Sequence, residues 1–191
     1  MGLLLGLASH PERSFEQWPL SENQKKSVLK GVFYVQSKVD STGENDNATQ
    51  KLNYKIAGLH PKSCSIALRR LTLYENYHQI LGFVEQSQYD EKEERISLVL
   101  GHTLLPFRMG LQFKIPRMKG PGRFPLTFDR GFLMGLVGQI EISEHLGRCA
   151  FYAEAAWEGP TTGIPDSVFS LFSTTLSRMA MESLFRASLN P

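Results

Sequence analysis

The sequence predicts an α+β fold in which a curved antiparallel β-sheet wraps around one long C-terminal α-helix. Between residues 102 and 157, successive segments alternate apolar and polar side chains with a period of two, which is typical of half-buried antiparallel strands. Residues 165–186 then carry apolar side chains at helical spacing. The chain has 191 residues, of which 41% are hydrophobic, so it is long and apolar enough to form one domain with its own core.

The first 30 residues differ from the rest of the chain. They contain prolines and scattered charges without a sustained period, so we expect residues 1–30 to form an irregular or short-helical lead-in and residues 31–191 to form the domain. Phe15 and Trp18 are the side chains that we expect to anchor the lead-in.

The domain begins with a predicted hairpin and a helical segment. Residues 32–39 and 51–56 are rich in β-branched and aromatic or alternating apolar side chains, and the polar stretch 40–48 between them has the composition of a loop. Residues 62–81 have helical spacing, with a bend expected at Asn76, which would divide them into two short helices.

Most of the remaining chain is predicted to be β structure. Charged or glycine-rich segments separate the alternating runs, and we expect turns at 90–94, 117–123, 129–131 and 144–147. The strands predicted between them are 82–89, 95–100, 105–115, 124–128, 132–142 and 149–157.

The final helix is expected to bury one apolar stripe against this sheet. Asp166 falls in its first turn, where a negative charge suits the helix dipole. The predicted stripe consists of Val168, Phe172, Leu176 and Met179, broadened by Leu171, Ala180 and Leu184.

Composition and motifs exclude several classes of function. The formal net charge is +2, which gives no sign of the clustered basic surface that nucleic-acid binding needs. No stretch approaches the roughly 18 apolar residues of a membrane-spanning helix. We find no nucleotide-binding loop, dinucleotide fingerprint, nucleophile elbow or metal-ligand spacing, so we expect neither a metal nor a cofactor.

The two cysteines and the N-terminus bear on the cellular compartment. Cys64 and Cys149 are far apart in the sequence, and we interpret them as two buried thiols, the alternative being a disulfide, which would need an oxidising compartment. Residues 1–10 contain a short apolar run without a positively charged start. A cytoplasmic location is therefore favoured over a periplasmic or secreted one, although a trimmed export signal is an alternative.

Three segments together resemble a known superfamily. They are HPKSCSIALRRLTLYENYHQILGFVEQSQY at 60–89, GRFPLTFDRGFLMGLVGQIEI at 122–142 and PDSVFSLFSTTLSRMAMESL at 165–184. Their order resembles that of the START-like superfamily, also called SRPBCC or helix-grip, and within it the polyketide cyclase/coenzyme Q-binding branch. The resemblance covers about residues 50–188 and leaves residues 1–49 without a role. It implies a cavity between the sheet and the last helix that binds a lipid, quinone or polyketide-like molecule, although a fold alone does not specify a function.

Apolar side chains on the predicted inner faces are the candidate ligand-binding residues. Phenylalanine and methionine suit an adaptable apolar binding surface, and simple filling of the core is the alternative. The candidates are Phe107, Met109, Leu111, Phe113, Phe124, Leu126, Phe128, Met134, Phe151, Phe172, Leu176 and Met179.

Few polar residues are candidates for the same cavity. His102, Tyr152 or Arg108 could orient a ligand, although the strand pattern places Arg108 on the solvated face. A cyclase or dehydratase would instead use His78, His102 or Glu154 as acid or base, and it requires at least two titratable side chains that converge in the cavity. Because the predicted wall is almost wholly apolar, a binding protein is favoured over an enzyme. A protein-interaction module of the same fold is a third alternative.

A basic segment surrounds the Gly-Pro-Gly sequence at 120–122. Lys114, Arg117, Lys119 and Arg123 lie close together in this segment, and such a turn could contact an anionic membrane surface transiently. A solvated loop is the alternative interpretation.

Overall fold

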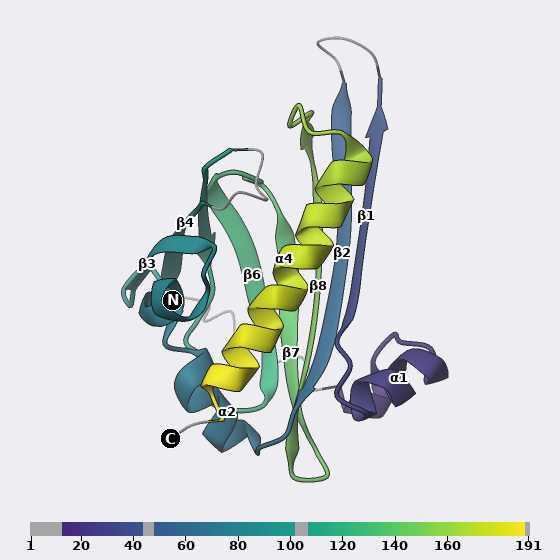
Figure 1. Cartoon of the computed structure of the whole chain (residues 1–191), viewed down its shortest axis with the longest axis vertical. Helices are drawn as coiled ribbons and strands as arrows, with labels where there is room; N and C mark the ends of the chain where they lie inside the picture. The colour runs from purple at the N-terminus through teal and green to yellow at the C-terminus, as the bar shows by residue number, and fades with distance from the viewer. Residues whose placement is uncertain (1–12, 44–47, 102–106, 190–191) are drawn as a thin grey trace, which may run out of the picture.

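The computed structural model describes residues 13–43, 48–101 and 107–189, and the described strands form one antiparallel sheet (Figure 1). Their order in the sheet is β1-β2-β8-β7-β6-β5-β4-β3. The strands are β1 (Tyr34–Thr42), β2 (Thr49–His60), β3 (Val84–Asp90), β4 (Arg95–Leu100), β5 (Met109–Lys114), β6 (Gly122–Gly131), β7 (Val137–His145) and β8 (Arg148–Pro160). The predicted α+β architecture is confirmed.

One long helix, α4 (Asp166–Ala187), crosses a single face of this sheet (Figure 1). The shorter helices are η1 (Phe15–Gln17), α1 (Glu22–Leu29), α2 (Cys64–Leu71), η3 (Tyr74–Asn76) and α3 (Tyr77–Ile80). The predicted division of this segment into short helices is present, but the break lies at Thr72 and Leu73, and at Asn76 the 3-10 helix η3 is followed directly by α3. In the described part of the chain, no helix has the length and apolarity to cross a membrane.

The predicted first hairpin is confirmed and joins the last strand of the sheet. β1 pairs with β2, and β2 pairs along its whole length with β8. Leu52 lies opposite both Val39 and Trp157 in this ladder. Pairing of the first hairpin with the last strand therefore places β2 between β1 and β8, one strand in from the edge of the sheet, and under α4.

The connection between β6 and β7 differs from the prediction. A turn was expected at 129–131, but β6 continues to Gly131 and the turn occupies residues 132–136. The side chain of Asp129 forms an ion pair with Arg95 of β4 instead of turning the chain. The backbone reverses where Gly131, Leu133 and Gly135 have φ angles of 77°, 63° and 93°, a conformation that glycine adopts without steric cost.

The N-terminal segment covers the face of the sheet that α4 leaves open. A second hydrophobic cluster forms there, separate from the core beneath α4. Its members are Phe15, Trp18, Leu20 and Val28 from the N-terminal segment and Ala57, Leu59, Ala150 and Tyr152 from β2 and β8. The expected anchoring by Phe15 and Trp18 is thus present, and the Trp18 and Tyr152 rings lie 5.5 Å apart.

A buried carboxylate reinforces this contact. Glu141 of β7 is only 1% exposed, and it accepts a 2.9 Å hydrogen bond from Nε of Arg13. Arg123 of β6 lies 3.2 Å from the same carboxylate. A buried carboxylate without such partners would be costly, and Arg13 and Arg123 supply the opposite charges at this position.

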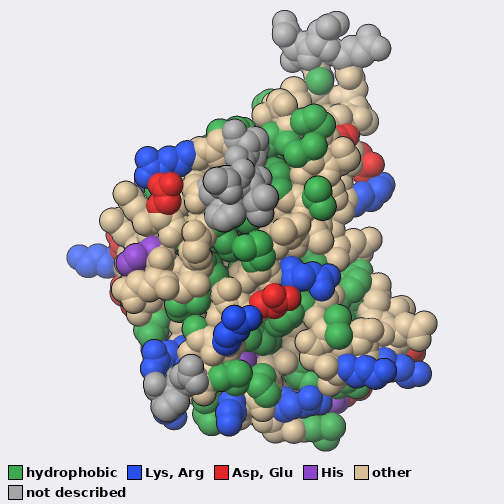
Figure 2. All heavy atoms as spheres, viewed as in Figure 1, with side chains coloured by type: hydrophobic (Ala, Val, Ile, Leu, Met, Phe, Trp, Pro, Cys, Tyr) green, Lys and Arg blue, Asp and Glu red, His purple; other side chains and the backbone are tan. Residues whose placement is uncertain are grey.

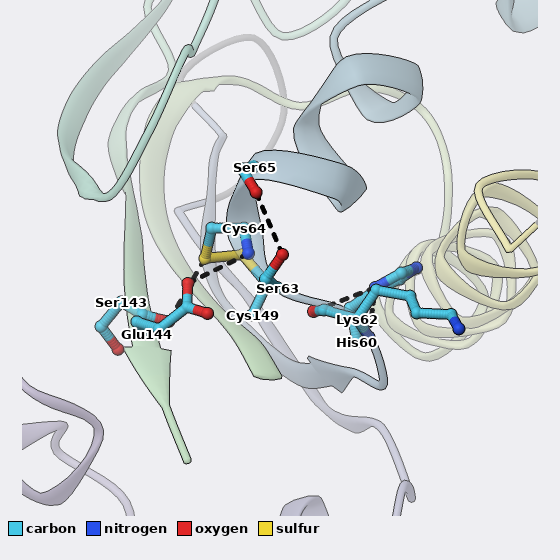
Figure 3. Close-up of a disulfide and its surroundings, with 8 residues drawn as sticks. All are labelled: His60, Lys62, Ser63, Cys64, Ser65, Ser143, Glu144 and Cys149. Carbon is cyan, nitrogen blue, oxygen red and sulfur yellow. Dashed lines mark hydrogen bonds between the residues drawn. A yellow bond between two sulfur atoms is a disulfide. The ribbon is translucent and has the colours of Figure 1, made fainter. Parts of the chain in front are cut away.

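The two cysteines form a disulfide, which corrects the interpretation as free thiols (Figure 3). Cys64 begins α2, Cys149 lies near the start of β8, and their Cα atoms are 4.5 Å apart. The backbone N–H of Cys64 also donates to the Glu144 carboxylate. The disulfide therefore attaches α2 to the middle of the sheet.

Removing the disulfide should destabilise the protein without changing its fold. The bond spans 85 residues of sequence, and removal of a native disulfide of this loop length costs roughly 2–5 kcal/mol. We expect the double variant Cys64→Ala/Cys149→Ala to melt at a lower temperature by about 2–4 °C per kcal/mol lost, as measured by calorimetry. Reductant should lower the melting temperature of the wild type but not of the variant. Equal melting temperatures for both proteins under oxidising conditions would contradict the predicted stabilisation.

His60, the last residue of β2, is fully buried at the C-terminal end of α4. Its Nδ1 accepts a hydrogen bond from the Lys62 N–H, and its Nε2 lies 2.9 Å from the Ser188 hydroxyl. This arrangement fits the neutral ring that carries its proton on Nε2. Burial lowers the pKa of His60 below its ordinary value.

The lowered pKa of His60 predicts a loss of stability in mild acid. At pH values between the folded and unfolded pKa, the unfolded chain binds more protons, so the free energy of unfolding decreases as pH falls below about 6.5. Urea unfolding over this pH range should show that dependence, and His60→Gln should reduce its slope. His78→Gln is the control for replacing a histidine by an amide. A slope unchanged by His60→Gln would rule out His60 as its source.

Candidate functional site

A cavity of about 300 Å³ lies between α4 and the sheet face that it crosses. Strands from both halves of the sheet, the 132–136 turn, α3 and α4 all contribute to its wall. The lining residues are Leu52, Tyr54, Tyr77, Leu81, Phe83, Val84, Leu98, Leu100, Met109, Leu111, Phe128, Phe132, Leu133, Leu136, Phe169, Phe172, Ser173, Leu176, Ser177, Ala180 and Leu184.

The rotation of α4 about its axis decides which of its residues face the cavity. The lining stripe is Phe169, Phe172, Leu176, Ala180 and Leu184, which follows helical spacing. In contrast, two members of the predicted stripe, Val168 and Leu171, point to solvent, and Leu171 is 68% exposed. Figure 2 shows hydrophobic side chains along this outer face together with charged ones.

Hydrogen bonds to β1 explain this rotation of α4. The Ser170 hydroxyl donates to the Ser37 carbonyl at 2.8 Å, and the Ser173 hydroxyl lies 2.7 Å from the Ser37 hydroxyl. These contacts direct the serine side of the helix towards β1. The apolar pattern of the sequence contains no information on these serine contacts. At the N-terminal half of the helix it therefore predicted Val168 and Leu171, each one residue before the lining residues Phe169 and Phe172.

Hydroxyl groups are the polar part of the described cavity wall. Tyr54 of β2 lines the cavity together with Ser173 and Ser177 of α4, and the Ser177 hydroxyl donates to the Ser173 carbonyl at 2.6 Å. The Tyr77 hydroxyl donates to the Leu71 carbonyl at 2.7 Å. Burial raises the pKa of Tyr54 and of Tyr77 above the ordinary value, so both phenols stay protonated at neutral pH.

Five of the predicted ligand-binding residues lie on the cavity wall. They are Met109, Leu111, Phe128, Phe172 and Leu176. Three come from the strands β5 and β6 and two from α4, so the structure brings together segments that are more than 40 residues apart in the chain. Their role in ligand binding stays a prediction.

Six other candidates are not part of the wall, although they lie within the structure. Phe113, Phe124, Leu126 and Met179 pack on the main core. Phe113 stacks on the cavity-lining Phe128, with ring centroids 4.8 Å apart. Phe151 is buried against Phe185 beneath the C-terminal part of α4, and Phe107 is 46% exposed at the surface.

Met134 is placed away from the wall by the corrected turn. It was predicted on the inner face of a strand, but it lies in the 132–136 turn and is 64% exposed. Its neighbours Phe132, Leu133 and Leu136 line the cavity instead. The two-residue alternation of a strand therefore predicted an inward position that Met134 does not have, because the backbone of a turn does not keep the period of a strand.

Several lining residues were missed by sequence analysis. Leu52 and Tyr54 alternate on one predicted strand, but the sequence does not show that β2 lies beside β8 under α4. Ser173 and Ser177 were missed because serines were not considered as wall residues. Their spacing from Phe169 and Leu176 on α4 is the signal that could have identified them.

The polar candidates do not converge on the cavity. Arg108 is 61% exposed and forms an ion pair with Glu85. Glu154 and Tyr152 are hydrogen bonded to each other and belong to the opposite face of the sheet, where Arg13 approaches them. His78 is at the surface, where its backbone N–H and Nδ1 both contact the Ser87 hydroxyl. His102 lies outside the described residues.

The basic segment around Gly120 is partly neutralised. Arg117 forms ion pairs with Glu75 and Glu91 and stacks over the Tyr89 ring. Arg123 approaches the buried Glu141. Two of the four basic side chains are therefore engaged within the protein. Among the described residues, there is also no cluster of His, Cys, Asp and Glu suited to a metal ion.

Comparisons with known proteins give no match by sequence but clear matches by structure. No protein-family model and no curated protein matches this sequence. A STAR-related lipid transfer protein fragment from Xanthomonas axonopodis superposes with a TM-score of 0.53 at 8% identity, covering 80% of this chain and 99% of its own.

Two further solved structures also superpose on this chain. A START superfamily protein from Mycobacterium smegmatis has a TM-score of 0.55 at 6% identity, covering 71% of this chain and 96% of its own. The protein Ara h 8.0201 has a TM-score of 0.56 at 9% identity, covering 74% and 99% respectively. At such low identity, these matches describe the backbone arrangement. The described chain has the START-like, helix-grip fold.

Proposed function

We propose that this protein binds a hydrophobic small molecule, such as a lipid, quinone or polyketide-like compound, in the cavity between the sheet and α4. The observation that carries this proposal is a cavity of about 300 Å³ lined by apolar side chains and a few hydroxyls. Its volume lies at the lower end of the range of known small-molecule sites. Lipid-transfer and START proteins among the structural matches support the same class of ligand.

Burial of apolar ligand surface would supply the affinity. Each Å² removed from water contributes about 25 cal/mol before the costs of association are subtracted. A cavity formed by both sheet halves and α4 surrounds a ligand on several sides, so most of the ligand surface would be buried.

An enzymatic function receives less support from the site. A cyclase or dehydratase needs an acid and a base near the reacting atoms. Among the described lining residues, only Tyr54 and Tyr77 titrate, and burial raises the pKa of both. The candidates Glu154 and His78 lie elsewhere.

Filling the cavity should abolish binding. Ala180→Phe places a ring in the space that a ligand would occupy, whereas Leu171→Phe adds a similar ring on the exposed side of the same helix. With the neutral fluorescent probe N-phenyl-1-naphthylamine, we expect Ala180→Phe to weaken binding by about 10-fold or more, which corresponds to about 1.4 kcal/mol, and Leu171→Phe to bind like the wild type.

Two further measurements complete this test. Leu184→Phe is a second filling variant for the case that Ala180→Phe unfolds, and thermal melting identifies such unfolding. Native mass spectrometry of the purified wild type should also detect a co-purified apolar molecule. If both filling variants fold and bind the probe like the wild type, the cavity is not the binding site.

We also propose that the chain folds in an oxidising compartment, in place of the cytoplasmic location favoured from the sequence. The Cys64–Cys149 disulfide supports this proposal, since such bonds are rare in a reducing cytosol. Acid quenching of cells followed by thiol alkylation should find both cysteines unmodified. Two alkylated cysteines would contradict folding in an oxidising compartment.

Transient contact with a membrane stays a prediction. Of the basic segment, only Lys114 and Lys119 are exposed and outside the ion pairs described above.

A further inference from the structure

The chemistry of the cavity wall restricts the charge of a ligand. The described lining residues include no Asp, Glu, Lys, Arg or His. An ion that enters an apolar environment loses its hydration, and without a partner of opposite charge or several hydrogen bonds that loss is not compensated. An ionised carboxylate or ammonium group would therefore oppose binding regardless of its sign.

The hydroxyl groups of the wall are concentrated where β2 faces the middle of α4. The Ser177 hydroxyl donates its proton to the Ser173 carbonyl at 2.6 Å, and Tyr54 lines the same wall as Ser177. The Ser177 proton is therefore engaged within the helix, and the Ser177 oxygen keeps its lone pairs. The lone pairs of the Tyr54 and Ser177 hydroxyls accept a hydrogen bond from a ligand hydroxyl.

The volume restricts the size of the ligand. A cavity of about 300 Å³ equals the liquid volume of roughly ten water molecules, which is the space of a compact molecule of about 10–20 non-hydrogen atoms. A phospholipid with two acyl chains has several times as many atoms and does not fit inside this volume.

We infer that the cavity selects small uncharged molecules with an apolar body and a single hydroxyl group, and that Tyr54 and Ser177 receive this hydroxyl. The inference rests on the proposed function, because it names the class of ligand for the same cavity. It assigns the selectivity to the wall itself: the absence of charged lining groups rejects ions, and the Tyr54–Ser177 pair orients an alcohol.

Three ligands with an unbranched chain of ten carbon atoms test the selection by charge. Decan-1-ol, decanoate and decyltrimethylammonium would each be titrated at pH 8 against wild-type protein loaded with N-phenyl-1-naphthylamine, below their micelle-forming concentrations. We expect decan-1-ol to displace the probe with an affinity at least about 10-fold higher than that of either ion. If either ion displaces the probe as well as the alcohol does, the selection for uncharged ligands is wrong.

Two variants test the assignment of the hydroxyl contact. Tyr54→Phe and Ser177→Ala should weaken binding of decan-1-ol by about fivefold, the loss of one ordinary hydrogen bond, and leave the affinity for the probe within about twofold. Their matched controls are Tyr34→Phe, whose hydroxyl donates to Gln36 at the surface, and Ser27→Ala on α1, whose hydroxyl donates to the Asn23 carbonyl at the surface. If a variant and its control lose the same affinity for decan-1-ol, the assignment is overturned. It is also overturned if neither Tyr54→Phe nor Ser177→Ala weakens binding of decan-1-ol.

The same experiment separates this inference from the proposed function. If neither the probe nor decan-1-ol binds to the wild type, the cavity does not bind small molecules and the proposed function fails. If the probe binds and is displaced by the ions as readily as by the alcohol, the proposed function stands and only the selectivity is wrong.

Discussion

Attachment of α4 at both ends is the constraint on which the rest of the structure depends. At the N-terminal end, the buried amide of Gln50 donates to the Ile164 carbonyl and to Asp166, and Asp166 accepts a hydrogen bond from the Ser41 N–H. At the C-terminal end, His60 lies within hydrogen-bonding distance of Ser188. Because polar contacts hold both ends, the helix does not need to bury its whole length against the sheet. The space beneath its middle can remain open.

The sheet forms the opposite wall of that space through its strand order. Pairing of β2 with β8 places the first hairpin next to the last strand, so that residues from both ends of the chain face α4. At the contact between β7 and β8, a side chain at Gly138 would come within 2.4 Å of the Glu154 carbonyl oxygen. Only glycine allows the two strands to approach so closely there.

The two faces of the sheet carry different kinds of side chain. The face under α4 contains the main core and the cavity, and the polar groups of the described cavity wall are hydroxyls. The opposite face carries charged residues, among them the buried Glu141, and the N-terminal segment covers part of it through Arg13, Phe15 and Trp18. Keeping the ionised groups on the face away from α4 is what leaves the described cavity wall without charge. It also gives the N-terminal segment a structural role that the minimal fold does not require.

The sequence by itself determined the α+β class, the succession of strands and the long final helix, because the periods of two and 3.6 residues follow directly from strand and helix geometry. Local chemistry also identified the β1–β2 hairpin. Only the tertiary structure decided the position of the β6–β7 turn, where Asp129 pairs with Arg95 instead of turning the chain. It likewise decided the rotation of α4, which depends on hydroxyl contacts with β1, and the pairing of Cys64 with Cys149. In each case the deciding partner is distant in the sequence, and periodicity reports only on neighbours along the chain. The sequence could therefore predict an apolar wall, but which side chains line the cavity followed only from the folded arrangement.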